Sequence, residues 1–249
     1  MVLEATMLLI DNSEWMINGD YIPNRFEAQK DSVHLIFNQK INDNPETMCG
    51  LMTMGDNNPQ VLSTLTRDYG KFLSAMHDLP VRGDSKFGDA IQIAQLALKH
   101  RENKTQRPRI VAFVGSPVVE DEKNLIRLAK RMKKNNIAID IVHIGELESE
   151  GALQRFIEAA NSNDNCHLVS VPPSSQLLSD LVNQSPIGQG VAASQGQFEY
   201  GVDPNLDPEL ALALELSMAE ERARQEVAAQ KPAEPSEPAE EQGDKKMQE

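Results

Sequence analysis

Apolar positions in the front part of the chain follow two alternating patterns. Nearly unbroken apolar runs of strand length, typical of strands buried on both faces of a sheet, occur at 5–11, 109–115, 137–145 and 167–171. The segments between them carry apolar residues at helical spacing instead. This spacing predicts helices at 24–41, 69–77, 90–104, 120–135, 151–160 and 174–184.

A shorter pair of apolar segments, 49–54 and 60–66, is separated by the turn residues Asp56 to Pro59. This pair predicts a hairpin that adds one antiparallel strand at an edge. Buried strands alternating with helices indicate an α/β fold. We therefore expect a doubly wound, mostly parallel sheet with one antiparallel edge strand.

Composition changes sharply after this part of the chain. We expect a folded domain over residues 1–187 and, over 188–204, a flexible linker rich in Gly, Gln, Ser and Pro. Residues 205–224 form a predicted isolated helix. Residues 225–249 are charged and low in complexity, which predicts a disordered acidic tail.

The formal net charge is −14, and residues 190–249 hold 14 acidic and 5 basic side chains. Because no basic stripe is visible, nucleic acid is not an expected partner. No apolar run approaches the ~18 residues of a membrane span. Cys49 and Cys166 stand alone and predict two small buried thiols. With no signal-peptide pattern either, we expect a soluble intracellular protein.

Motifs of catalysis are absent from the sequence. It contains no glycine-rich dinucleotide loop, no Walker loop and no G-x-S-x-G elbow. The five histidines never fall at H-x-x-x-H spacing, which favours structural roles. We predict that the chain is not an enzyme and uses no cofactor.

The first apolar run leads into Asp11, Asn12, Ser13, Glu14 and Trp15. This DNSEW segment resembles the D-x-S-x-S metal motif of von Willebrand factor type A domains, and the order of elements over about residues 1–187 is similar to that family. The segment GDSKFGDAI resembles the second motif segment, with Ser85 at the threonine position. In that family these residues hold a divalent ion with oxygen ligands.

Two positions depart from the family pattern. Trp15 replaces the second serine, and Gly115 stands where the fourth strand normally ends in an aspartate. Too few anionic oxygens remain for a tight site, so we expect no metal. Ligand crevices of open α/β sheets lie at the carboxyl ends of the strands. We therefore interpret Asp11 and Ser13 as candidate docking residues on an exposed crevice rim.

The predicted helix in the tail has an apolar stripe of about two turns. Leu210, Ala213, Leu214, Ser217 and Met218 share one face at offsets 3, 4, 7 and 8 from the first. Such a helix could dock on its own domain or form half of a coiled coil. The stripe is short for a coiled coil, and its small residues suit close approach to a shallow surface.

The same residues resemble the ubiquitin-interacting motif, an acidic start followed by Φ-x-x-A-x-x-x-S-x-x-acid. The resemblance implies that Ala213 contacts the apolar patch of ubiquitin, that bulky neighbours surround it and that Ser217 forms a hydrogen bond. Acids would meet ubiquitin's basic rim. The implied ubiquitin-binding residues are Glu209, Leu210, Ala213, Leu214, Ser217, Met218, Glu220 and Glu221.

Together, a degenerate von Willebrand A domain, a linker and one ubiquitin-interacting motif resemble the non-ATPase ubiquitin-receptor subunits of the proteasome regulatory particle. The single motif and short tail are similar to fungal forms. The resemblance implies a non-enzymatic polyubiquitin receptor in cytoplasm and nucleus, anchored by its front domain among other regulatory-particle subunits. The alternative is a metal-dependent adhesion or scaffold domain with an incidental tail helix.

Overall fold

The computed structural model describes residues 3–189, except 57, 78, 146–148, 163 and 174–175. A six-stranded sheet in the order β3-β2-β1-β4-β5-β6 forms its centre. The strands are β1 (Glu4–Ile10), β2 (Met48–Thr53), β3 (Val61–Thr66), β4 (Arg107–Val114), β5 (Ala138–Ile144) and β6 (His167–Val171). Only the β2–β3 pair among them is antiparallel, which confirms the predicted edge hairpin.

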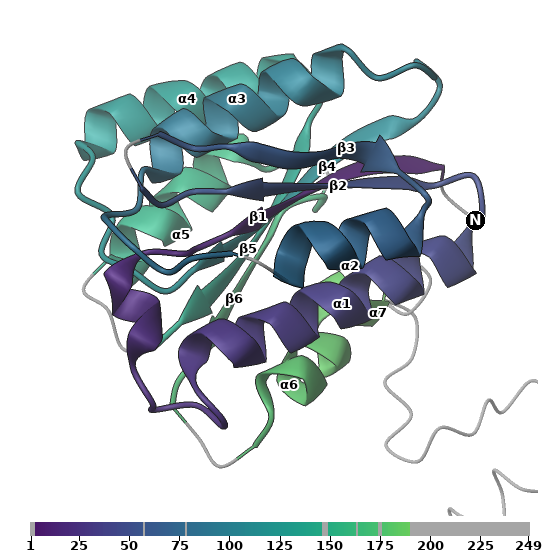
Figure 1. Cartoon of the computed structure of the whole chain (residues 1–249). Coiled ribbons are helices and arrows are strands. Elements are labelled where there is room, and N and C mark those ends of the chain that lie inside the picture. Colours follow the sequence, from purple (N-terminus) through teal and green to yellow (C-terminus); the bar gives the residue numbers. More distant parts are fainter. Residues whose placement is uncertain are drawn as a thin grey trace, which may run out of the picture. The chain divides into compact units, whose positions relative to one another are not determined.

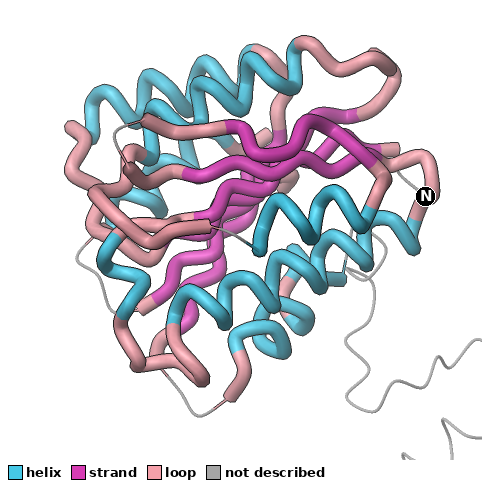
Figure 2. The backbone as a smooth tube through the Cα atoms, viewed as in Figure 1, coloured by secondary structure: helices cyan, strands magenta, loops and turns pink. Residues whose placement is uncertain are grey.

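Helices cover both faces of the sheet (Figures 1 and 2). One layer contains α3 (Phe87–Lys99), α4 (Glu122–Lys134) and α5 (Glu150–Ala160). The other contains α1 (Arg25–Asp43), α2 (Tyr69–His77), α6 (Leu178–Gln184) and α7 (Pro186–Gln189). The expected boundary at residue 187 falls inside α7, whose Ile187 is buried in the core.

The apolar strands separate two hydrophobic cores. Alternate residues of β1 point to opposite faces, so Met7 and Leu9 pack with α3, α4 and α5 while Leu8 and Ile10 pack with α1 and α2. Every residue of β1 is buried. The sheet is therefore covered on both sides, as unbroken apolar runs require.

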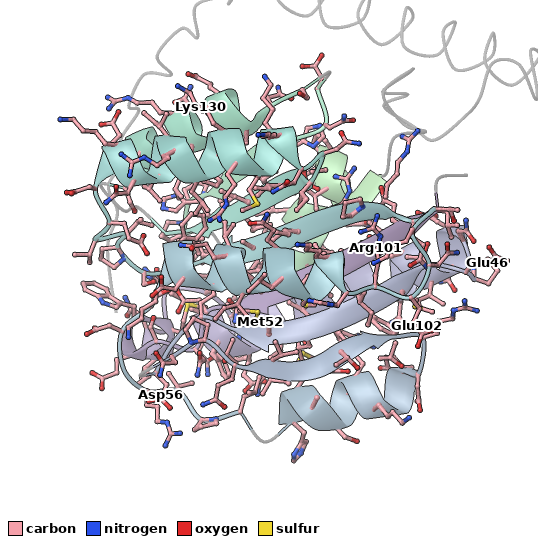
Figure 3. All side chains as sticks on the ribbon, turned by 90° about the horizontal axis from the view of Figure 1, so that it is seen from above. Glu46, Met52, Asp56, Arg101, Glu102 and Lys130 are labelled. Carbon is pink, nitrogen blue, oxygen red and sulfur yellow. The ribbon has the colours of Figure 1, made fainter. Side chains whose placement is uncertain are left out.

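The parallel strands begin at one end of the sheet and finish at the other, and we call these ends the amino edge and the carboxyl edge. The two have different chemistry. Parallel strands end at the left in Figure 1, where the short 3-10 helix η1 (Glu14–Ile17) follows β1. Figure 3 shows Asp56 at this carboxyl edge, with Glu46 and Arg101 at the opposite amino edge. Loops at the carboxyl edge position the candidate site.

The amino edge holds a chain of ionic contacts that crosses four strands. Arg109 Nε donates to Glu4 Oε1 at 3.1 Å, and its Nη1 donates to Asp140 Oδ2. Asp140 Oδ1 accepts from the backbone N–H of His167 at 3.1 Å and pairs with His167 Nδ1 at 2.9 Å. Lys40 Nζ joins from α1, 2.8 Å from Glu4 Oε2. We call Glu4, Arg109, Asp140 and His167 the ion chain.

Glu4, Arg109 and Asp140 of the ion chain are buried, and Arg109 lies between the two carboxylates. Burial alone would raise the pKa of the Asp140 carboxyl, but the hydrogen bond from His167 and the charge of Arg109 lower it below its usual value. Burial likewise opposes the charge of Arg109, yet Asp140 and Glu4 raise its pKa. Removing one partner would leave an uncompensated buried charge.

No helix among the described residues has the length and apolar character needed to span a bilayer.

Candidate functional site

Asp11 lies at the end of β1 and organises the carboxyl edge. Its Oδ1 accepts a hydrogen bond from the backbone N–H of Ser13 at 3.0 Å. Its Oδ2 accepts from the backbone N–H of Gly115 at 3.1 Å and from the hydroxyl of Ser116 at 2.6 Å. The carboxylate thus joins the loop after β1 to the loop after β4, and both of its oxygens have internal donors.

The expected exposure of Asp11 is wrong, because its side chain is fully buried, as is that of Ser13. The three internal donors explain this position, since they replace the water that an exposed carboxylate would need. A direct contact of Asp11 or Ser13 with a partner therefore needs the loop to move. The docking role of these two residues stays a prediction, and it can act only through the loop that they hold.

Gly115 stands at the position of the aspartate in the von Willebrand A pattern that the sequence resembles, and Met16 fills the space. A Cβ atom on residue 115 would collide with Met16 Sδ, and the Met16 side chain is fully buried. The methionine at position 16 therefore requires a residue without a side chain at position 115. Sequence reasoning noted Gly115 as a lost ligand but missed Met16, although a missing side chain in a packed interior is a signal that another side chain fills its place.

A second residue that the sequence reasoning missed is Arg25, the first residue of α1. Its guanidinium is buried, donates to both Asp20 oxygens at 2.6 Å and donates to the carbonyl of Gly115 at 3.0 Å. It also lies against Gly145, where φ is +92° and a Cβ atom would meet Arg25 Nη2. Arg25 therefore connects the loops after β1, β4 and β5.

The oxygens at this edge do not fit a divalent metal ion. Asp11 is the one carboxylate of the motif, and its oxygens already accept three hydrogen bonds. The hydroxyls of Ser13 and Ser85 are buried without partners, but Trp15 is half-exposed and cannot supply an oxygen. Ca²⁺ or Mg²⁺ takes about six or more oxygens. Within the described ranges no group of three His, Cys, Asp or Glu could hold a metal.

The cysteines and one histidine lie in the interior. Cys49 and Cys166 are free and buried, as predicted, and burial raises the pKa of Cys49 to about 12. His143 is fully buried in β5, with Nδ1 3.2 Å from Ser170 Oγ and no partner for Nε2 among the described atoms. Burial lowers the pKa of His143, which favours a neutral ring.

The predicted ubiquitin-binding residues, Glu209 to Glu221, lie outside the described residues. The same holds for the predicted linker, isolated helix and acidic tail, except for Gly188 and Gln189 in α7. These assignments remain predictions from the sequence.

Comparison with known proteins assigns the chain to a family. Residues 6–117 match the model of the von Willebrand factor type A domain. The chain is 85% identical to the 26S proteasome regulatory subunit rpn10 of Schizosaccharomyces pombe over 249 residues, which is the full length of both. It is 48% identical to the RPN10 subunit of Saccharomyces cerevisiae, covering 89% of this chain and 90% of that one.

A solved structure agrees with the fold. The crystal structure of the SpRpn10 VWA domain is 87% identical, covers 76% of this chain and 99% of its own, and superposes with a TM-score of 0.73. Identity over the full length, together with the same domain structure, shows that the chain belongs to the Rpn10 family of 26S proteasome regulatory subunits.

Proposed function

We propose that this chain is a non-enzymatic polyubiquitin receptor of the proteasome, acting in cytoplasm and nucleus. Its front domain would anchor in the regulatory particle, and residues 205–224 would bind ubiquitin on substrates. The observation that carries the proposal is the 85% identity to a proteasome regulatory subunit over the full length, including the tail whose sequence resembles the ubiquitin-interacting motif.

The filled crevice supports an adaptor role for the front domain. Open α/β sheets bind ligands at the carboxyl ends of their strands. Here Met16 and Arg25 fill that region, and the Asp11 carboxylate accepts hydrogen bonds from groups of the same domain. The same packing argues against the alternative of a metal-dependent adhesion domain.

Ubiquitin binding by one short helix should be weak. A small interface that orders on binding suggests a dissociation constant on the order of 10⁻⁴ M, or roughly −5 kcal/mol. Polyubiquitin that engages several receptors together would supply the missing affinity. The predicted linker, 188–204, would reach roughly 20–25 Å, so the helix could search while the domain stays anchored.

Expressing residues 1–189 and 190–249 separately tests the assignment of each part. The first fragment should bind purified regulatory particles and the second should bind polyubiquitin. Binding of polyubiquitin by the first fragment alone, or failure of the second to bind it, would contradict the proposal.

A further inference from the structure

Several exposed apolar side chains lie in segments at the carboxyl edge of the sheet. Nine large apolar residues are exposed in the described part of the chain, and five of them lie in loops that follow parallel strands: Trp15, Ile17, Ile22, Val119 and Leu177. The first three belong to residues 11–24, which we call the Trp15 loop. Their exposed fractions are 50%, 65% and 58%. Single exposed apolar residues are ordinary, whereas a group of them marks an interaction site.

The Trp15 loop is held firmly by residues that alternate with the exposed ones. Met16 and Tyr21 are buried beside Trp15, Ile17 and Ile22. The Tyr21 hydroxyl donates to the carbonyl of Val171 at 2.5 Å and accepts from the N–H of Gly145 at 2.9 Å. The N–H of Glu14 donates to the carbonyl of Gly83 at 3.0 Å.

These contacts fix the loop to its neighbours on several sides. A surface that is already ordered loses little conformational entropy on binding. Trp is also the residue type most enriched among those that dominate interface affinity. The anchored loop therefore holds its apolar side chains in solvent, where a partner can contact them.

Charge around the loop indicates the chemistry of the partner. The five loops that follow parallel strands, 11–24, 54–60, 115–121, 145–149 and 172–177, contain no Lys or Arg in the sequence. Their acidic residues within the described ranges are Asp11, Glu14, Asp20, Asp56, Glu120 and Asp121, of which Asp11 is fully buried.

Two of these acids are neutralised by nearby cations. Arg82, on the segment that crosses this edge, pairs with Asp56 at 2.9 Å, and Arg25 pairs with Asp20. Glu14 is exposed next to Trp15. An apolar group within an acidic edge is complementary to an apolar pocket bordered by cations.

We propose that the Trp15 loop is a docking surface for a regulatory-particle subunit whose apolar pocket is bordered by Lys and Arg side chains. This inference rests on the proposed function and names the anchoring residues of the front domain. The excess of acids disfavours a second copy of the same edge and an anionic membrane surface as partners.

The test uses the full chain and regulatory particles that lack this subunit, with bound fraction measured at several salt concentrations. The double variant Trp15→Ala with Ile17→Ser should weaken binding roughly tenfold or more. The matched control is Leu73→Ser with Leu96→Ser, whose residues are 43% and 55% exposed on α2 and α3. It should bind like the unchanged chain. Glu14→Lys should lower the bound fraction and reduce its dependence on salt.

The other possible results separate failure of the docking surface from failure of the proposed function. Equal binding by the Trp15 variant and the control would overturn the docking surface while leaving the proposed function intact. No capture of the unchanged chain would refute the proposed function and with it this inference. Sedimentation of a dimer that the Trp15 variant abolishes, or ubiquitin binding that it abolishes, would assign the loop to those partners instead. Melting curves guard against misfolding, and Ile22→Ser gives a second variant at the other end of the loop.

Discussion

Met16 Sδ occupies the space that a Cβ atom on Gly115 would need. A side chain from the loop after β1 therefore fills the space beside the loop after β4. The von Willebrand A pattern that the sequence resembles has an aspartate at the position of Gly115. Here a thioether and a guanidinium fill the interior, and the motif residue Asp11 has become a structural connector between loops.

The pairing of Met16 with Gly115 predicts the effect of adding one methyl group. Gly115→Ala should lower the free energy of unfolding by about 1–3 kcal/mol, because the buried methionine must move. Gly151→Ala is the control, since nothing lies within 4 Å of its added Cβ. Denaturant unfolding measures both. Adding Met16→Ala to Gly115→Ala should recover part of the loss relative to the sum of the single changes, and strict additivity would contradict the contact.

Asp11→Ala should destabilise the domain by about 2–4 kcal/mol, because it leaves three buried donors without an acceptor. Ser116→Ala removes one donor and should cost less. Urea titrations of both variants check the order. Because Asp11 is buried, any loss of proteasome docking in Asp11→Arg should come with a lower melting temperature. Docking lost at an unchanged melting temperature would show that the carboxylate contacts the partner directly.

Arg109→Met should lower the free energy of unfolding by about 3–5 kcal/mol, because Glu4 and Asp140 would lose their shared guanidinium. Arg107→Met is the matched control, since Arg107 lies exposed two residues earlier on β4 and should change stability by less than about 0.5 kcal/mol. Chemical denaturation of the two variants measures the contrast. Similar losses for both would mean that the ion chain contributes little.

Stability should fall in mild acid because of His143. Burial lowers the pKa of its folded form below the ordinary 6.5, so the unfolded chain binds a proton first as pH falls. Stability from this group is therefore complete above pH 6.5 and declines between 6.5 and the folded pKa, by up to about 1.4 kcal/mol per pH unit. Unfolding measured from pH 7.5 to 5.5 should show the decline, and His143→Gln should flatten it. An unchanged slope in the variant would assign the effect to other groups.

Ala213→Asn should abolish ubiquitin binding and leave the front domain unchanged. An amide at the centre of the predicted contact adds bulk and costs roughly 1–3 kcal/mol if it stays unpaired. Against a total near −5 kcal/mol this change would bring binding below detection. Titration of labelled ubiquitin with Ala211→Asn, which lies off the stripe, provides the control. Equal weakening by both variants would indicate lost helix propensity instead of a specific face.

The strands could be predicted more accurately than the helix ends. Apolar runs located β1, β4 and β5 within about two residues, because burial on both faces leaves a continuous signal. The helix expected at 90–104 runs from Phe87 to Lys99, since Arg101 donates to the backbone carbonyls of Leu98 and Gln106 and stabilises the turn after the helix. The helix expected from 174 begins at Leu178.

Tertiary contacts of the site were beyond the reach of the sequence pattern. The motif identified Asp11, but its burial depends on Gly115 and Ser116, about a hundred positions away. In the sequence, Arg25 is only the first residue of a predicted helix. Its contact with the carbonyl of Gly115 depends on the fold. Short segments such as η1 carry no periodicity at all, so the Trp15 loop was visible only as a departure from a family pattern.

The ion chain also has a consequence for the alignment of the strands. Shifting a strand by one residue turns every side chain to the opposite face. If β4 paired with β5 one residue out of step, Arg109 and Asp140 would point to opposite faces of the sheet, and the buried Asp140 carboxylate would lose its guanidinium partner. Parallel sheets form slowly from distant segments and so pass through many trial pairings. The ionic contacts of Glu4, Arg109 and Asp140 would therefore penalise a wrong alignment of these strands.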